Sequence, residues 1–209
     1  MEDGRVVLRV GLTGNIASGK SSVARVWRRH GAAVLDADQL ARVAVEPGSE
    51  GLRRVVAAFG PGILDAQGRL DRAALRDIVF RDREARRKLE AIVHPEVGRL
   101  RAEEEAKLRR GGACIVVHDI PLLYETGLEA EFDVIVLVDA PPAIRLERLV
   151  RDRGLGADEA RRMIEAQMPA EQKRSRADYV IDNVGGLDEL ERKAVEVWKE
   201  LRRRAGECG

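Results

Sequence analysis

Hydrophobic positions along the chain form short continuous runs, separated by longer stretches in which apolar and charged residues recur with helical spacing. The short runs are rich in Val, Ile and Leu, which is typical of strands covered on both faces of a parallel sheet. Their alternation with amphipathic stretches predicts an α/β fold, with a parallel sheet flanked by helices. The expected strands are 6–12, 32–35, 113–118, 134–138 and 179–181, and the clearest helices are 20–30 and 187–203.

The expected strands are unevenly spaced, which predicts two helical insertions. Residues 39–111 separate the second and third strands and have helical periodicity throughout, with turns expected at Pro47-Gly48, Gly60-Pro61-Gly62, Gly68 and His94-Pro95. Residues 141–177, also helical and rich in arginine, precede the last strand. We therefore expect a discontinuous core made of 6–38, 112–140 and 178–205, a helical subdomain over 39–111 and a second helical insertion over 141–177.

Charge and cysteine content narrow the class of protein. The chain has 37 basic and 36 acidic side chains, so its net charge predicts neither a nucleic-acid nor a membrane partner. No apolar stretch is long enough to span a membrane, and the charged N-terminus is unlike a signal peptide. Cys114 and Cys208 lie far apart in sequence, so we expect no disulfide framework and a cytoplasmic location. The sequence does not indicate an oligomeric state; a monomer is the expectation.

A glycine-rich segment follows the first expected strand and opens the first expected helix. Glycines let successive backbone N–H groups turn toward phosphate oxygens, and the helix N-terminus adds partial positive charge. In such a loop Lys20 would reach the β- and γ-phosphates of a nucleotide, and the Ser21 hydroxyl would ligate Mg²⁺. The residues that match the pattern G-x-x-x-x-G-K-[ST] are Gly14, Asn15, Ile16, Ala17, Ser18, Gly19, Lys20 and Ser21.

Aspartates follow the second and third expected strands, at the edge of the sheet where ligands bind in open α/β folds. Asp38 is the candidate base that orients an alcohol acceptor and takes its proton, with Asp36 as a supporter. The alternative is that one of the two caps the next helix. Asp119 is the candidate carboxylate for the shell of a Mg²⁺ ion, and the alternative is a turn residue before Pro121.

Arginines crowd the second insertion, at Arg145, Arg148, Arg151 and Arg153. The planar guanidinium group suits the spread charge of a phosphoryl group in transfer. An insertion at this place predicts a lid that closes over the nucleotide and excludes water. The alternative is a solvated helix face.

Several longer motifs in order resemble the dephospho-CoA kinase family, over residues 7–190. They are Leu12–Ser21, Leu35-Asp36-Ala37-Asp38, Ala41-Arg42, Glu46-Pro47-Gly48, Ile78-Val79-Phe80, His94-Pro95, Asp119-Ile120-Pro121-Leu122-Leu123-Tyr124-Glu125, Ala166-Gln167-Met168-Pro169 and Ala177–Asn183.

The resemblance implies an ATP-dependent phosphotransferase that phosphorylates the ribose 3′-hydroxyl of dephospho-CoA and releases CoA and ADP, with Mg²⁺ as cofactor. It implies that 39–111 binds the acceptor and that 141–177 is the lid of the nucleotide-binding core. Phe80 and His94 are lesser candidates for the acceptor pocket. The alternatives are that Phe80 is an ordinary core aromatic and that His94 marks a helix break before Pro95. The implied roles are Asp38, Lys20, Arg148 and Arg153 in catalysis; Gly14 to Ser22 and Asn183, near the adenine, in nucleotide binding; Asp38, Arg42, Phe80, His94, Pro121 and Leu122 in acceptor binding; and Ser21 and Asp119 at the metal.

Departures from the family pattern are few. Asn15 stands where many members have glycine, and Tyr124 replaces phenylalanine. The lid arginine after Arg148 is either Arg151 or Arg153, and we prefer Arg153 because it directly precedes Gly154. The alternatives are a P-loop kinase for a nucleoside monophosphate, a sugar acid or shikimate, a non-catalytic binding module, and a GTP-driven switch, whose guanine-reading N-K-x-D motif we do not find.

Overall fold

The computed structural model describes residues 7–206, and the chain divides into two compact units. The first comprises the residues up to Leu35 and those from Leu108 onward, and it contains the sheet. The second is Asp36–Lys107 and is helical.

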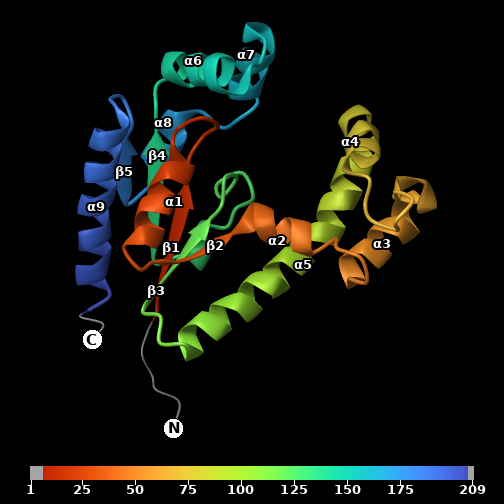
Figure 1. The fold of residues 1–209 in the computed structure, drawn as a ribbon, viewed down its shortest axis with the longest axis horizontal. Helices are drawn as coiled ribbons and strands as arrows, with labels where there is room; N and C mark the ends of the chain where they lie inside the picture. The colour runs from red at the N-terminus through yellow and green to blue at the C-terminus, as the bar shows by residue number, and fades with distance from the viewer. Residues whose placement is uncertain (1–6, 207–209) are drawn as a thin grey trace. The chain divides into compact units, whose positions relative to one another are not determined.

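The first unit is built on a five-stranded sheet with the strand order β2-β3-β1-β4-β5 (Figure 1). The pairs β1–β3, β1–β4 and β4–β5 are parallel, which confirms the predicted α/β class. The first strand lies at the centre because strands from later in the chain add on both of its sides. The bounds are β1 Leu8–Thr13, β2 Ala33–Asp36, β3 Ile115–Asp119, β4 Val134–Asp139 and β5 Tyr179–Asp182.

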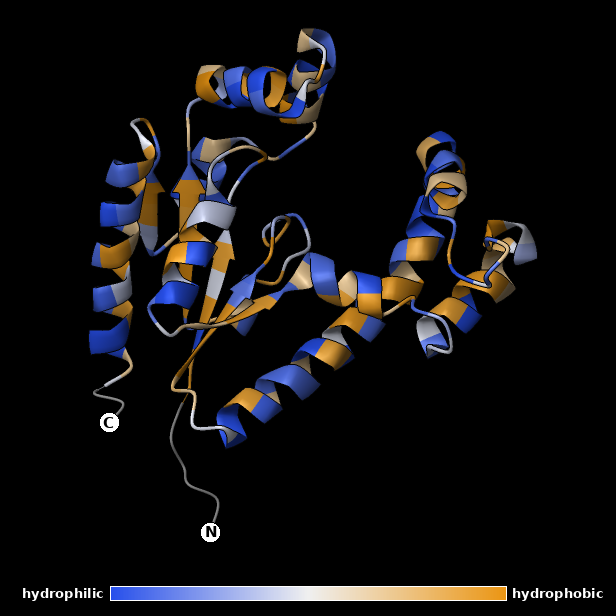
Figure 2. Ribbon diagram, in the orientation of Figure 1, coloured by the Kyte–Doolittle hydropathy of each residue, from blue (hydrophilic) through white to orange (hydrophobic). Residues whose placement is uncertain are grey.

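Helices cover the sheet because their apolar faces pack on its Val- and Leu-rich strands (Figure 2). Trp27 of α1 lies against Trp198 of α9, with ring centroids 5.9 Å apart, and its indole Nε1–H donates to the Ala194 carbonyl at 2.8 Å. The two helices and the central strands therefore share one core. The bounds are α1 Lys20–Arg29, η2 Glu129–Glu131, α6 Pro142–Arg153, α7 Ala157–Glu165, α8 Ala170–Arg174 and α9 Leu187–Arg204.

The second unit has a core of its own, formed by Val45, Val55, Ile63, Leu75 and Ile92. Side chains that accept hydrogen bonds from backbone N–H groups start three of its helices, and these caps are Asp36, Ser49 and Asp71. Its elements are α2 Ala37–Val43, α3 Glu50–Phe59, η1 Pro61–Ile63, α4 Arg72–Arg81 and α5 Arg83–Arg110, the last of which continues into the first unit.

Two expectations from the sequence are wrong. The turn expected at His94-Pro95 is absent, because α5 continues through Pro95. Proline has no N–H group, so the helix gives up one hydrogen bond there but does not end. Cys114 is disulfide-bonded, although the sequence predicted no disulfide framework; Cys208 lies outside the described residues. Among the described residues, no helix combines the length and apolar character that crossing a membrane requires.

Candidate active site

The glycine-rich loop joins β1 to α1 and has the backbone geometry of a phosphate cradle. Ala17 and Gly19 both have left-handed backbone conformations, with φ of 59° and 99°. At Gly14 an added Cβ atom would come within 2.5 Å of the Val138 carbonyl oxygen, so a larger residue would push the loop away from β4. Gly14 is therefore required by the close approach of the loop to the sheet, and Gly19 by its left-handed backbone conformation.

Carbonyl groups of this loop accept hydrogen bonds, one from within the loop and two from the side chains of Arg148 and Asn183. The Ser18 N–H donates to the Asn15 carbonyl at 3.0 Å, Arg148 Nη1 donates to the Ala17 carbonyl at 3.1 Å, and Asn183 Nδ2 donates to the Ser18 carbonyl at 2.7 Å. Within residues 7–206, the amides of Ala17 and Gly19 have no acceptor. Together with the first amides of α1, they are donors available to phosphate oxygens.

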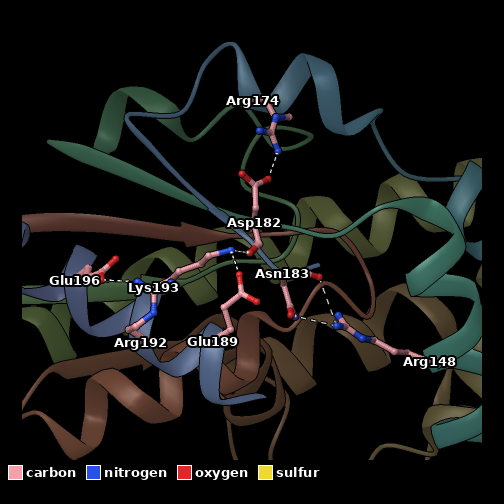
Figure 3. A network of polar contacts seen from close by, with 8 residues as sticks. All are labelled: Arg148, Arg174, Asp182, Asn183, Glu189, Arg192, Lys193 and Glu196. Atoms are coloured by element: carbon pink, nitrogen blue, oxygen red, sulfur yellow. Dashed lines mark hydrogen bonds and ion pairs between the residues drawn. The ribbon is translucent and has the colours of Figure 1, made fainter. Parts of the chain in front are cut away.

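Arg148 and Asn183 support each other as well as the loop (Figure 3). Arg148 Nη2 donates to Asn183 Oδ1 at 3.1 Å, and Asn183 is 4% exposed. Asn183 directly follows β5, whose last residue Asp182 pairs with Arg174 of α8 at 2.6 Å and accepts at its carbonyl from Lys193 of α9 at 2.8 Å. The side chain of Asn183 is thus used in fixing the loop, and its expected proximity to adenine stays a prediction.

Lys20 and Asp119 form an ion pair at the carboxyl ends of β1 and β3. Their side chains are 13% and 7% exposed, so burial strengthens the attraction between the two charges. Ser21 is exposed in the first turn of α1. The hydroxyl and the carboxylate are oxygen ligands of the kind Mg²⁺ takes in combination with phosphate oxygens and water, so the residues present fit such an ion.

The second unit carries the candidate base. Asp36 has extended backbone (φ −96°, ψ 112°) and caps α2, because its Oδ1 accepts from the amides of Asp38 and Gln39 at 2.9 and 3.1 Å. The capping alternative therefore applies to Asp36. Asp38 is exposed, and its carboxylate has no hydrogen bond or ion pair with any described residue. It is chemically available to act on a ligand.

The candidate acceptor-binding residues are mostly at the surface. Phe80 in α4 is 90% exposed, so the alternative that it is a core aromatic is wrong. Arg42 at the end of α2 and His94 in α5 are also exposed. In the first unit Pro121 is half-buried and accepts from Thr13 Oγ1 at 3.2 Å, while Leu122 is 42% exposed.

The arginines of α6 have different environments. Arg145 is buried, and its Nε donates to the Ala140 carbonyl at 3.0 Å; burial lowers the pKa of its guanidinium group. Arg148 holds the loop, and Arg151 pairs with Glu147 and Asp152 at 2.8 and 2.7 Å. Arg153 is exposed without an ion pair to a described residue. These four arginines therefore do not form a single solvated helix face, because two are in contact with backbone carbonyl groups and two are exposed.

The segment after α7, Ala166-Gln167-Met168-Pro169, lies in the predicted lid, and the sequence predicts no separate role for its individual residues. Gln167 Oε1 accepts from the Ile16 amide at 2.8 Å, and the Met168 carbonyl accepts from Asn15 Nδ2 at 3.1 Å. The segment is thus in direct contact with the glycine-rich loop. The motif is a signal for this segment, but no local pattern predicts that it contacts residues 15 and 16.

Comparisons with known proteins identify the family of the chain. The family model described as dephospho-CoA kinase matches residues 8–189. Dephospho-CoA kinase of Thermobifida fusca is 48% identical over 198 residues, covering 95% of this chain and 98% of the relative; that of Anaeromyxobacter dehalogenans is 48% identical and covers 92% of each.

Solved structures give the same result. The crystal structure of TT1252 from Thermus thermophilus matches with a TM-score of 0.79 and 43% identity, covering 94% of this chain and 98% of that one. Dephospho-CoA kinase from Campylobacter jejuni matches with a TM-score of 0.72 and 25% identity, with the same coverage. The family model and the relatives that match almost the whole chain thus lead to one assignment: the chain belongs to the dephospho-CoA kinase family.

Proposed function

We propose that this kinase transfers the γ-phosphoryl group of ATP to the ribose 3′-hydroxyl of dephospho-CoA and releases CoA and ADP. The observation that carries the proposal is the pair of amides at Ala17 and Gly19 without an acceptor among the described residues, at the start of α1 beside Lys20, in a chain of this family. Amides in such a loop bind the β- and γ-phosphates.

Each charged residue of the site has a role in the proposal. Lys20 binds the β- and γ-phosphates, with Asp119 beside it at the metal. The exposed Asp38 carboxylate orients the acceptor hydroxyl and takes its proton as the oxygen bonds to the γ-phosphorus. The bond between the γ-phosphorus and the bridging oxygen breaks, and ADP leaves with both electrons of that bond. Ser21 and Asp119 are the residues that would hold a Mg²⁺ ion, which would supply positive charge beside the phosphates.

The remaining residues act on the two substrates. Arg148 fixes the loop through the Ala17 carbonyl, and Arg153, whose guanidinium has no carboxylate partner among the described residues, is available to stabilise the transferring phosphoryl group. Arg42, Phe80 and His94 are proposed to bind the acceptor from the helical unit, with Pro121 and Leu122 at the end of β3. Exposure of Phe80 supports this, since a 90% exposed phenyl ring is available to a ligand.

The test is the position of the new phosphate. With MgATP and dephospho-CoA, phosphorus NMR of the product should show one phosphomonoester on the ribose 3′-oxygen. An acceptor with hydrogen in place of the 3′-hydroxyl is the control and should give no product. A phosphate at another oxygen, or equal turnover of the 3′-deoxy acceptor, would contradict the proposal.

A further inference from the structure

Two hydrogen bonds tie the first half of the glycine-rich loop to residues far along the chain. The Ile16 amide donates to Gln167 Oε1 at 2.8 Å, and the adjacent Asn15 side chain donates from Nδ2 to the Met168 carbonyl at 3.1 Å. Asn15 is only 4% exposed, so its bond is shielded from water. The second half of the loop is held by Arg148 and Asn183 instead. The loop therefore has two independent sets of supports.

The support on the side of Gln167 is itself anchored by an ion pair between the buried Lys173 and the more exposed Glu125. The Met168 amide donates to Glu125 Oε1 at 3.3 Å, and the same oxygen lies 2.7 Å from Lys173 Nζ. The Lys173 side chain is 0% exposed, and a buried ammonium group is stable only beside a compensating carboxylate. The Lys173–Glu125 pair thus fixes the position of residues 166–169, and through them that of Asn15 and Ile16.

Asn15 adds a contact that depends on its side chain. A glycine at this position would have no side chain and could not reach the Met168 carbonyl. The amide of Asn15 adds a hydrogen bond one residue before the Ile16 contact. Asn15 and Ile16 are thus bonded to Met168 and Gln167, respectively. Two such neighbouring bonds restrict both the position and the orientation of the loop backbone.

We propose that Gln167 is a positioning residue for the nucleotide: it holds the Ile16 amide, and with Asn15 it keeps the loop in its phosphate-binding conformation. Residues 166–169 directly follow α7, which packs on α6. The latch, meaning the Asn15–Met168 and Ile16–Gln167 bonds together, thereby links the predicted lid to the loop that binds phosphate. The inference deepens the proposed function and rests on it only for the identity of the nucleotide.

The test compares three variants at the latch with a matched control. Q167M keeps the length of the side chain and removes the acceptor, whereas Q167E keeps an acceptor oxygen. N15G removes only the bond to Met168. The control is Q172M, five positions further on, where the glutamine is exposed. We would measure the Kd for ADP by calorimetry and the exchange rate of the Ile16 amide by NMR, neither of which depends on the acceptor.

The latch predicts that Q167M weakens ADP binding about three- to tenfold, the worth of one hydrogen bond of ordinary strength. Ile16 exchange should rise in Q167M and stay at the wild-type rate in Q167E and Q172M. N15G should weaken ADP binding by a smaller factor with the chain still folded, as its circular dichroism would show. Wild-type ADP affinity in both Q167M and N15G would overturn the proposal, and so would equal effects of Q167M and Q172M. Failure to phosphorylate dephospho-CoA would instead overturn the proposed function and leave these results to stand.

Discussion

At the scale of single residues, ion-pair partners distinguish two arginines in the last turn of α6. Arg151 is neutralised by Glu147 and Asp152, and Arg153 has no carboxylate partner among the described residues. A guanidinium group that already pairs with carboxylates interacts less favourably with a phosphoryl group than an unpaired one does. The difference is modest, because exposed ion pairs are individually weak. The difference favours Arg153 as the residue that acts on phosphate.

We expect R153M to lower kcat by at least about tenfold, because it removes a cation from the transferring phosphoryl group. R151M is the matched control and should change kcat by less than about threefold, since it removes only exposed ion pairs. Steady-state kinetics with both substrates in excess would measure this. The reverse order of the two effects would contradict the assignment.

Tyr124 has a buried hydroxyl with no hydrogen-bond partner among the described residues, and Arg176 lies 4.8 Å from the centre of its ring. Burial raises the pKa of Tyr124 from 10.0 to about 12, and Arg176 partly opposes this. Between these two pH values the unfolded chain releases the phenolic proton and the folded chain keeps it. The contribution of protonated Tyr124 to the free energy of unfolding is therefore fully present below pH 10.0 and is lost as the pH rises through about 12.

Phenylalanine at this position keeps the ring and the contact with Arg176 but cannot titrate. We expect Y124F to unfold at pH 7 with a free energy equal to wild type or up to about 1 kcal/mol higher, because an unpaired buried hydroxyl is removed. Its free energy of unfolding should also fall less steeply than that of wild type above pH 10. Urea titrations at a series of pH values would test this, and identical slopes for the two proteins would refute it.

At the scale of elements, side-chain caps set where the helices of the second unit begin. Asp71 accepts from the amides of Ala73 and Ala74 at 2.9 and 3.0 Å and starts α4. We expect Asp71→Ala to lower the free energy of unfolding by about 1 kcal/mol, while Asp71→Asn, which can still cap, stays close to wild type. Urea denaturation would measure both, and equal losses in the two variants would show that charge and not capping is responsible.

The elements also show what sequence can predict here. Continuous apolar runs located all five strands, because a strand covered on both faces leaves few positions for polar residues. Pro95 misled the prediction because a helix packed through Ile92 can tolerate the loss of one hydrogen bond. The choice between Asp36 and Asp38 as cap depends on the local backbone angles. The Ile16–Gln167 contact joins residues 151 positions apart, and no local pattern predicts it.

At the scale of the whole molecule, the two units have separate hydrophobic cores. Val55 belongs to the helical core and Val136 to the core of the sheet, and both are 0% exposed. Each Val→Ala change removes comparable buried apolar volume, at a cost of roughly 2 kcal/mol. Because the cores are separate, we predict that each substitution destabilises mainly the unit that contains it.

We expect V55A to speed amide exchange within residues 36–107 and to leave the exchange of β1 and β4 and the Kd for ADP close to wild type. V136A should speed exchange in β1 and β4 instead. Hydrogen exchange followed by mass spectrometry would map both variants. Equal acceleration in both units by V55A would show that they unfold as one.

The measurement that tests the central claim most directly is ADP release from MgATP with dephospho-CoA, compared with adenosine, AMP and shikimate, in wild type and in Asp38→Asn. Asp77→Asn is the control, since Asp77 is also exposed in the helical unit and has no partner among residues 7–206. We predict release with dephospho-CoA only, lowered by about 10² or more in Asp38→Asn, as expected for a lost general base, and unchanged in Asp77→Asn. Release with another acceptor but not with dephospho-CoA, or full activity of Asp38→Asn, would contradict the account.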